Sequence, residues 1–197
     1  MSATADFLKS DFAATLFPLK TNLLMAEMHE KEVSEYIYQK ILDEKQAGDN
    51  FLPQQRVHAT KPRGHVRRTV KLDPVAEYFI YDVVYRNRAV FRPEVSTNRR
   101  SFGYRFKEGV HISVHAAYTE YKKCLVENDN GVKRKLQFDI ASYFNSLYHH
   151  DIYHWFAGSP NVSEGDSNAM GKYIREINAG RSVDFLPQGL YPCKMIG

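Results

Sequence analysis

The sequence is poor in the features that mark secreted and membrane proteins. It has two cysteines, Cys124 and Cys193, which lie far apart and in no spacing typical of metal ligands. A chain with so few cysteines has no disulfide framework, which favours a reducing compartment and predicts a cytoplasmic location. The sequence has no basic start followed by an apolar stretch, and no apolar run long enough to span a bilayer. We therefore expect neither a secretory signal nor a membrane partner.

Internal repeats and low-complexity tracts are also missing, and the overall composition is that of a globular protein. Of the 197 residues, 43% are hydrophobic and 25% are charged. The 13 tyrosines and 12 phenylalanines predict a substantial core, together with surfaces on which bases or sugars can rest. The net charge of +4 is a mild excess, but between Arg56 and Arg105 there are twelve Lys or Arg and four Asp or Glu. Such a segment fits either a phosphate-facing surface or a solvated face, and charge alone leaves both open.

Hydrophobic periodicity predicts a mixed order of helices and strands. Helical periodicity covers residues 10–45, where Val33, Ile37 and Ile41 recur every four residues. Asp73 and Pro74 begin a helix with a capping residue and a proline in its first turn. The remaining expected elements are a helix whose apolar face carries Val110, Val114, Ala117, Tyr121 and Leu125, and helices over 141–157 and 168–179. In the 141–157 helix, Trp155 and Phe156 are the expected core anchors.

Residues 56–72 read as a β-hairpin with a basic tip. Apolar residues alternate with polar ones on both arms, which puts Arg67 and Lys71 on the face opposite Val70. Pro62 and Gly64 in the tip predict a type I turn. A basic hairpin with a tight tip can reach over a ligand.

Residues 135–140, KLQFDI, read as a short β-strand. Leu136, Phe138 and Ile140 alternate and are predicted to face a core together, so Asp139 points the other way. Aspartate has low β-propensity, but it is tolerated at a strand end that faces a cleft. A nearby histidine group contains His150 and His154, one helical turn apart, but two histidines without further ligands do not make a zinc site.

Four segments, taken in order, resemble the reverse-transcriptase family, most closely its bacterial group II intron and retron members. Residues 61–67 (KPRGHVR) resemble the fingers motif, and residues 101–105 (SFGYR) resemble the Gly-Phe-Arg segment. Residues 138–144 (FDIASYF) resemble the first palm motif, and residues 186–189 (LPQG) resemble the loop that contacts the incoming nucleotide. Each motif alone is weak, whereas their order and spacing over residues 51–197 make the set specific.

The resemblance implies an α+β fold, a right-hand polymerase with fingers and an incomplete palm. Its expected parts are an N-terminal helical extension over 1–50, the fingers and the entry to the palm over 51–130, and over 131–197 the palm motif, return helices and nucleotide-contacting loop. The family's Tyr-x-Asp-Asp motif is not in the sequence, so this stretch alone is expected to be inactive. Arg68 and Thr69 replace the Pro-Leu usual in intron enzymes. At this and other positions that differ from the intron enzymes, the sequence resembles defence-associated, abortive-infection reverse transcriptases. This resemblance implies a role in antiviral defence.

The activity implied is RNA-directed DNA synthesis, in which two metal ions assist transfer of dNTPs onto a 3′-hydroxyl. Asp139 is the implied catalytic carboxylate and a ligand of Mg²⁺, with the carbonyl of Ile140 as a helper. Lys61 and Arg67 would grip the triphosphate, since cationic side chains bind phosphate oxygens and the planar fork of arginine donates two hydrogen bonds at once. Phe144 would exclude a 2′-hydroxyl. The resemblance assigns the remaining nucleotide contacts to Gln188 and Gly189.

The implied partners are RNA and DNA template-primers and dNTPs, with a non-coding RNA or a partner subunit as further candidates. Each site residue also has a structural interpretation: Asp139 as a helix cap, the hairpin arginines as a solvated face, and Phe144 as a core residue. Two other functions stay open from the sequence. One is a catalytically incomplete, polymerase-derived module that binds nucleic acid or a partner. The other is an RNA-templated RNA polymerase, against which Phe144 argues.

Overall fold

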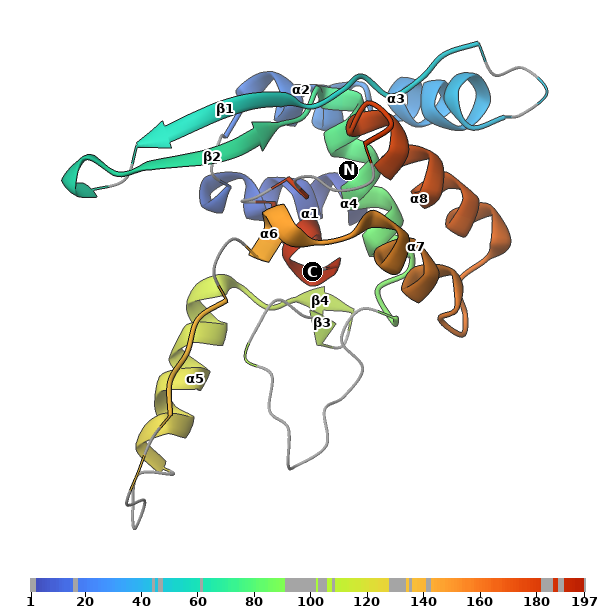
Figure 1. Ribbon diagram of the computed structural model, residues 1–197. Coiled ribbons are helices and arrows are strands. Elements are labelled where there is room, and N and C mark those ends of the chain that lie inside the picture. Colours follow the sequence, from blue (N-terminus) through green and yellow to red (C-terminus); the bar gives the residue numbers. More distant parts are fainter. Residues whose placement is uncertain are drawn as a thin grey trace.

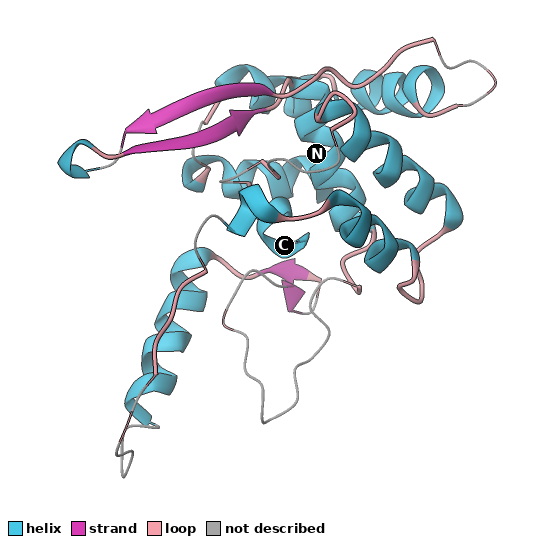
Figure 2. Cartoon of the chain, viewed as in Figure 1, coloured by secondary structure: helices cyan, strands magenta, loops and turns pink. Residues whose placement is uncertain are grey.

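The protein, described by a computed structural model, has an α+β fold with two small antiparallel sheets (Figures 1 and 2). The structure describes residues 3–15, 18–43, 45, 48–60, 62–90, 102, 106–107, 109–127, 134, 136–140, 143–181, 186–187 and 190–196. The helices are α1 (Ala3–Asp11), α2 (Lys20–Met28), α3 (Glu30–Tyr36), α4 (Pro74–Arg86), α5 (Val114–Glu127), α6 (Tyr143–Ser146), α7 (His149–Ala157), α8 (Glu164–Ile177) and α9 (Tyr191–Ile196). Shorter turns are η1 (Phe12–Ala14), η2 (Ile37–Ile41, π-helical) and η3 (Pro62–Gly64). The strands are β1 (Gln55–Thr60), β2 (Val66–Lys71), β3 (Phe106–Lys107) and β4 (Val110–His111).

Helix α4 lies at the centre of the helical body. Its start is the predicted one, because the Asp73 carboxylate accepts hydrogen bonds from the main-chain amides of Val75 and Ala76 at 2.9 and 3.3 Å. The sequence pattern also predicts an apolar stripe along one side of this helix, made of Ala76, Phe79, Ile80, Val83 and Val84. The structure buries this stripe, but it also buries Tyr81 on the opposite side. The sequence pattern indicated one buried side. The structure corrects this, because α1, α2, α3, α8 and α9 all contact α4.

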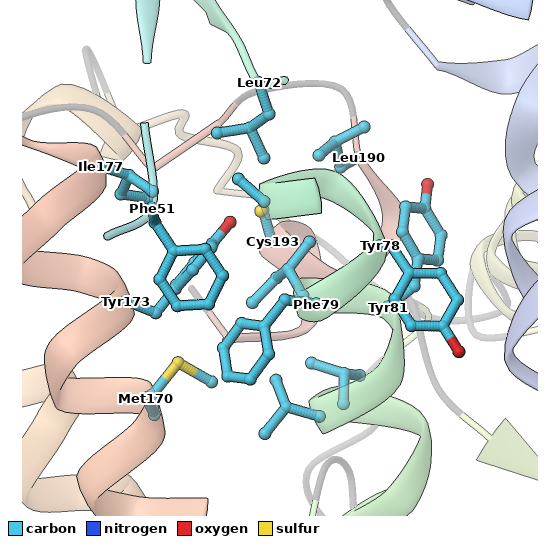
Figure 3. Close-up of a cluster of buried hydrophobic side chains, with 14 of the residues drawn as sticks. Phe51, Leu72, Tyr78, Phe79, Tyr81, Met170, Tyr173, Ile177, Leu190 and Cys193 are labelled. Carbon is cyan, nitrogen blue, oxygen red and sulfur yellow. The ribbon is translucent and has the colours of Figure 1, made fainter. Parts of the chain in front are cut away.

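The core joins segments from the whole length of the chain (Figure 3). At its centre Phe79 of α4 packs against Phe51 and against Tyr173 of α8, with ring centroids 4.9 and 5.0 Å apart. Leu72, at the end of the hairpin, and Leu190, before α9, belong to the same cluster. Burying a large apolar side chain of this kind contributes about 1.5–3 kcal/mol. The hairpin and the C-terminal helix are therefore held by one core.

The predicted N-terminal helices are confirmed in outline, although helix begins earlier, at Ala3, and is interrupted between α1 and α2. Val33 and Ile37 are buried as expected. Phe7 and Leu8, in the first helix, are buried too, and they belong to the same core cluster as Phe79. None of the helices within the described residues combines the length and apolarity needed to cross a lipid bilayer.

Helix α5 projects away from the body and is mostly exposed (Figure 1). Of the face predicted to be apolar and packed, Ala117 is buried, whereas Val114 and Leu125 are 39% and 43% exposed. Trp155 is also predicted to be a core anchor, but it is 45% exposed, whereas its neighbour Phe156 is 1% exposed. The two adjacent residues of α7 point to different sides of the helix, so only one can reach the core.

The strand predicted over 135–140 is wrong for the residues that the structure describes there. Residues 136–140 form no strand, and Leu136, Phe138 and Ile140 are 88%, 80% and 61% exposed. Alternation produces a strand only where a neighbouring strand supplies hydrogen-bond partners. Both sheets in the described part of the chain pair other segments, β1 with β2 and β3 with β4.

Candidate functional site

The β1–β2 hairpin is the most prominent basic feature of the molecule, and Figure 1 shows it extending beyond the helical body. Its strands pair antiparallel, with Ala59 opposite Arg67. Residues 51–72 contain six Lys or Arg and no Asp or Glu. The hairpin is anchored at its base, where Thr69 and Val70 are 1% and 3% exposed. In its outer half, Arg63 and Arg67 are exposed to solvent.

The tip of the hairpin differs from the type I turn expected from the sequence. Arg63 has φ 69° and ψ 26°, and Gly64 has φ 77°, so two successive residues are left-handed. Glycine adopts this conformation without strain, whereas at Arg63 it costs about 1 kcal/mol or more. A type I turn has negative φ at both central residues, which excludes it here.

Of the two cationic residues predicted to bind the triphosphate, Arg67 is described and Lys61 lies outside the described residues. Arg67 is exposed on β2 and makes no hydrogen bond or ion pair with any residue that the structure describes. Side chains alternate along a strand, so Arg67 shares a face with Thr69 and Lys71, and Arg68 lies on the other face. Arg67 therefore lies on the face of β2 opposite Val70, as predicted.

The segment that resembles the first palm motif and the segment predicted as the nucleotide loop meet at Phe144. The main-chain amide of Leu186 donates a hydrogen bond to the carbonyl of Phe144, with 3.4 Å between N and O. Phe144 is partly buried against the core, and its ring lies edge-on to that of Tyr143 at 5.3 Å between centroids. Gln188 and Gly189, the residues expected to contact the nucleotide, lie outside the described residues. The structure thus joins the two motif segments through backbone contact.

Asp139, the predicted metal ligand, is exposed, as is Ile140 beside it. A carboxylate and a carbonyl oxygen are the kind of ligand that Mg²⁺ prefers, so the chemistry of these two residues fits. Two ligands are too few, however, because a two-metal site needs several carboxylates. Within the described residues no three His, Cys, Asp or Glu side chains gather as metal ligands. Asp139 and the Ile140 carbonyl therefore make up only part of a two-metal site.

The buried carboxylate of Asp11 holds α9, the helix that follows Leu190, in place. The sequence gives no sign of this contact. Asp11, 2% exposed at the end of α1, accepts hydrogen bonds from the Tyr81 hydroxyl at 2.5 Å and from the Tyr191 amide at 2.9 Å. Burial raises the pKa of Asp11, and these two hydrogen bonds oppose the rise. Asp11 thereby ties α1, α4 and α9 together.

A second buried acid, Glu77, lies on α4 just after the hairpin. Asn22 of α2 donates a hydrogen bond from its side-chain amide to the Glu77 carboxylate. Burial raises the pKa of Glu77 to about 7, and the hydrogen bond from Asn22, followed by the positive charge of Lys71 on β2, partly opposes this rise. No local pattern marks either buried acid, because the partners of Asp11 and Glu77 are dozens of residues away in the sequence.

No protein-family model matches this chain, and no curated protein gives a significant match to it.

Proposed function

We propose that this chain is the fingers and first palm part of an RNA-directed DNA polymerase that transfers dNTPs onto a 3′-hydroxyl, in bacterial antiviral defence. The observation that carries the proposal is the exposed basic hairpin, anchored by Leu72 in the core that also holds Leu190 (Figure 3). A protruding two-stranded arm without acidic residues attracts phosphate groups. Its anchor places it on the same core as the segment that follows the predicted nucleotide loop.

In this proposal each residue has a defined task. Arg67 and Lys61 bind the triphosphate, and Arg67 does so through its two-pronged guanidinium. The ring of Phe144 lies under the sugar and excludes a 2′-hydroxyl. Gln188 and Gly189 contact the nucleotide, and the hydrogen bond between Leu186 and Phe144 supports a common location for these groups.

Asp139, with the Ile140 carbonyl, supplies the first ligands of Mg²⁺, and the other carboxylates come from outside the described residues. The bound cation would neutralise the triphosphate. The exposure of Asp139 supports this assignment over a helix cap, since the side chain is not committed to a buried contact.

Nucleotide and template binding test the proposal without requiring turnover. We expect the chain to bind a fluorescent dATP analogue and an RNA–DNA template-primer with a recessed 3′ end. Arg67→Glu should weaken nucleotide binding by about tenfold or more, because it replaces a phosphate contact with repulsion. The matched control is Lys31→Glu on α3, an equal charge change at a side chain that is 84% exposed.

Equal nucleotide affinity in the Arg67→Glu variant would remove Arg67 from the site. A wild-type chain that binds neither the nucleotide nor the template-primer would overturn the polymerase assignment. Binding of the template-primer without binding of the nucleotide would instead favour the second candidate, a polymerase-derived module that binds nucleic acid. The absence of a paired strand at 136–140 is the observation that favours this candidate.

A further inference from the structure

A groove with a volume of about 1240 Å³ runs along α7 and α8, and it is separate from the residues assigned to the nucleotide. In Figure 1 these two helices lie on the side of the body opposite the hairpin. Pockets that enclose a single small ligand have volumes of roughly 300–1000 Å³. The groove is larger and open, so its size fits a segment of a polymer.

The charged side chains that line the groove are mostly basic. Among the described residues, Arg86, Lys172, Arg175 and Arg181 line it, together with one acidic residue, Asp166. The two carboxylate oxygens of Asp166 are already occupied, since they accept hydrogen bonds from Arg86 at 2.6 Å and from Asn87 at 2.9 Å. The excess charge is positive, which favours an anionic ligand.

The basic side chains of the groove differ in the hydrogen bonds and ion pairs that they already make. Lys172 donates a hydrogen bond to the carbonyl of Ile41 at 2.6 Å and forms an ion pair with Glu176 at 3.6 Å. The Arg175 side chain is exposed and makes no hydrogen bond or ion pair with any residue in the described part of the chain. Arg175 is therefore the cation most available to a phosphate.

One end of the groove is fixed by a buried histidine. His149, 7% exposed, donates from Nδ1 to the carbonyl of Arg181 at 3.1 Å. Its Nε2 accepts from the side-chain amide of Asn178 at 3.3 Å. Because both ring nitrogens are used, His149 holds the Arg181 backbone against α7. Arg175, six residues earlier in the chain, lines the same groove.

Aromatic rings line the same groove. Tyr148 is 43% exposed, and its ring lies 5.8 Å from that of His150. Tyr153 packs on the backbone of α8, because a Cβ at Gly171 would lie 2.9 Å from its ring. An exposed ring beside cationic side chains is the arrangement that binds single-stranded nucleic acid, since bases stack on rings while phosphates pair with cations. An acidic peptide would use the cations and leave the rings unused.

We propose that the α7–α8 groove binds single-stranded nucleic acid, with Tyr148 stacking on a base and Arg175 contacting a phosphate. This surface is additional to the proposed nucleotide site, and it shares none of the residues assigned there.

Fluorescence anisotropy with a labelled oligouridine of about 12 nucleotides tests the groove in the 197-residue chain. Tyr148→Ala should weaken binding by about tenfold and leave the salt dependence unchanged, because it removes a stacking surface and no charge. Arg175→Gln should weaken binding and reduce the slope of log K against log salt by about 0.7, the value for one phosphate contact on a single strand. Lys31→Glu is the control and should change neither quantity.

A photo-crosslink from 4-thiouridine locates the bound strand independently of the variants. We expect the crosslinked peptide to come from α7, and we expect oligothymidine to compete with the RNA. Crosslinks confined to the β1–β2 hairpin would overturn the proposal, as would normal binding in both groove variants. Equal competition by polyglutamate would assign the groove to acidic peptides instead. The unlabelled dATP analogue should not displace the oligouridine, so a failure of the groove is distinguishable from a failure of the nucleotide site.

Discussion

The Asp11 carboxylate accepts a hydrogen bond from the main-chain amide of Tyr191, 180 residues later in the chain, with 2.9 Å between the two atoms. The same carboxylate oxygen also accepts from the Tyr81 hydroxyl. The first and last described helices are thus fastened to α4 at one buried point. This contact holds the start of α9 against α1.

Replacement of Asp11 should therefore be costly for stability. Asp11→Ala leaves the Tyr81 hydroxyl and the Tyr191 amide buried without an acceptor, and we expect a loss of about 2–4 kcal/mol in the free energy of unfolding. Urea denaturation followed by circular dichroism measures this change. Asp6→Ala, an exposed aspartate in the same helix, is the control and should cost less than about 1 kcal/mol. Equal losses in the two variants would show that Asp11 does not fasten α9.

Glu77 should make the protein less stable as pH rises from acid to neutral. Its folded pKa, about 7, lies above the ordinary value of 4.5, so the folded protein holds the proton more tightly. The stabilising contribution is therefore complete below pH 4.5 and is lost as pH rises to 7, by roughly 3 kcal/mol. Glu77→Gln keeps an oxygen for Asn22 and should flatten this part of the stability curve. Urea midpoints at pH 5 and pH 8 measure the effect, and an unchanged slope in the variant would contradict it.

Two glycines in α8 should respond in opposite ways to the same substitution. At Gly171 a Cβ would lie 2.9 Å from the Tyr153 ring, whereas at Gly165 its nearest neighbour is the Ser163 hydroxyl at 3.9 Å. Gly165→Ala should stabilise the helix by up to about 1 kcal/mol through propensity alone. Gly171→Ala must displace Tyr153 and should destabilise the protein by about 1–2 kcal/mol. Thermal melting of the pair measures both signs, and equal stabilisation would show that Tyr153 moves freely.

Phe144 should govern the choice between deoxyribo- and ribonucleotides if the polymerase proposal holds. Phe144→Ala opens space for a 2′-hydroxyl, so the preference for a fluorescent dATP analogue over the ATP analogue should fall by about tenfold. Tyr143→Ala is the matched control, since its ring is adjacent to Phe144 at 5.3 Å between centroids. If Tyr143→Ala loses the preference instead, Tyr143 is the residue that excludes the 2′-hydroxyl.

Local chemistry determined much of the fold. Aspartate and proline at positions 73 and 74 set the start of α4, because a carboxylate can accept from the free amides of the first turn. Alternation and the turn residues set the hairpin, and its strands are paired in the structure as predicted from the sequence. The basic character of the arm follows from composition alone. These are short-range effects, since each depends on residues within a few positions of one another.

The tertiary structure decided which of those elements are buried and what lies beside them. Leu136 and Phe138 alternate as a strand would, yet they stay exposed because strand formation needs a partner that periodicity cannot provide. Trp155 and Phe156 are equally apolar, but their side chains leave α7 in different directions and only Phe156 meets the core. The pairing of Asp11 with Tyr191 and the groove beside Arg175 join residues distant in sequence. Contacts of that kind are fixed by packing of the whole chain, so the sequence carries no local sign of them.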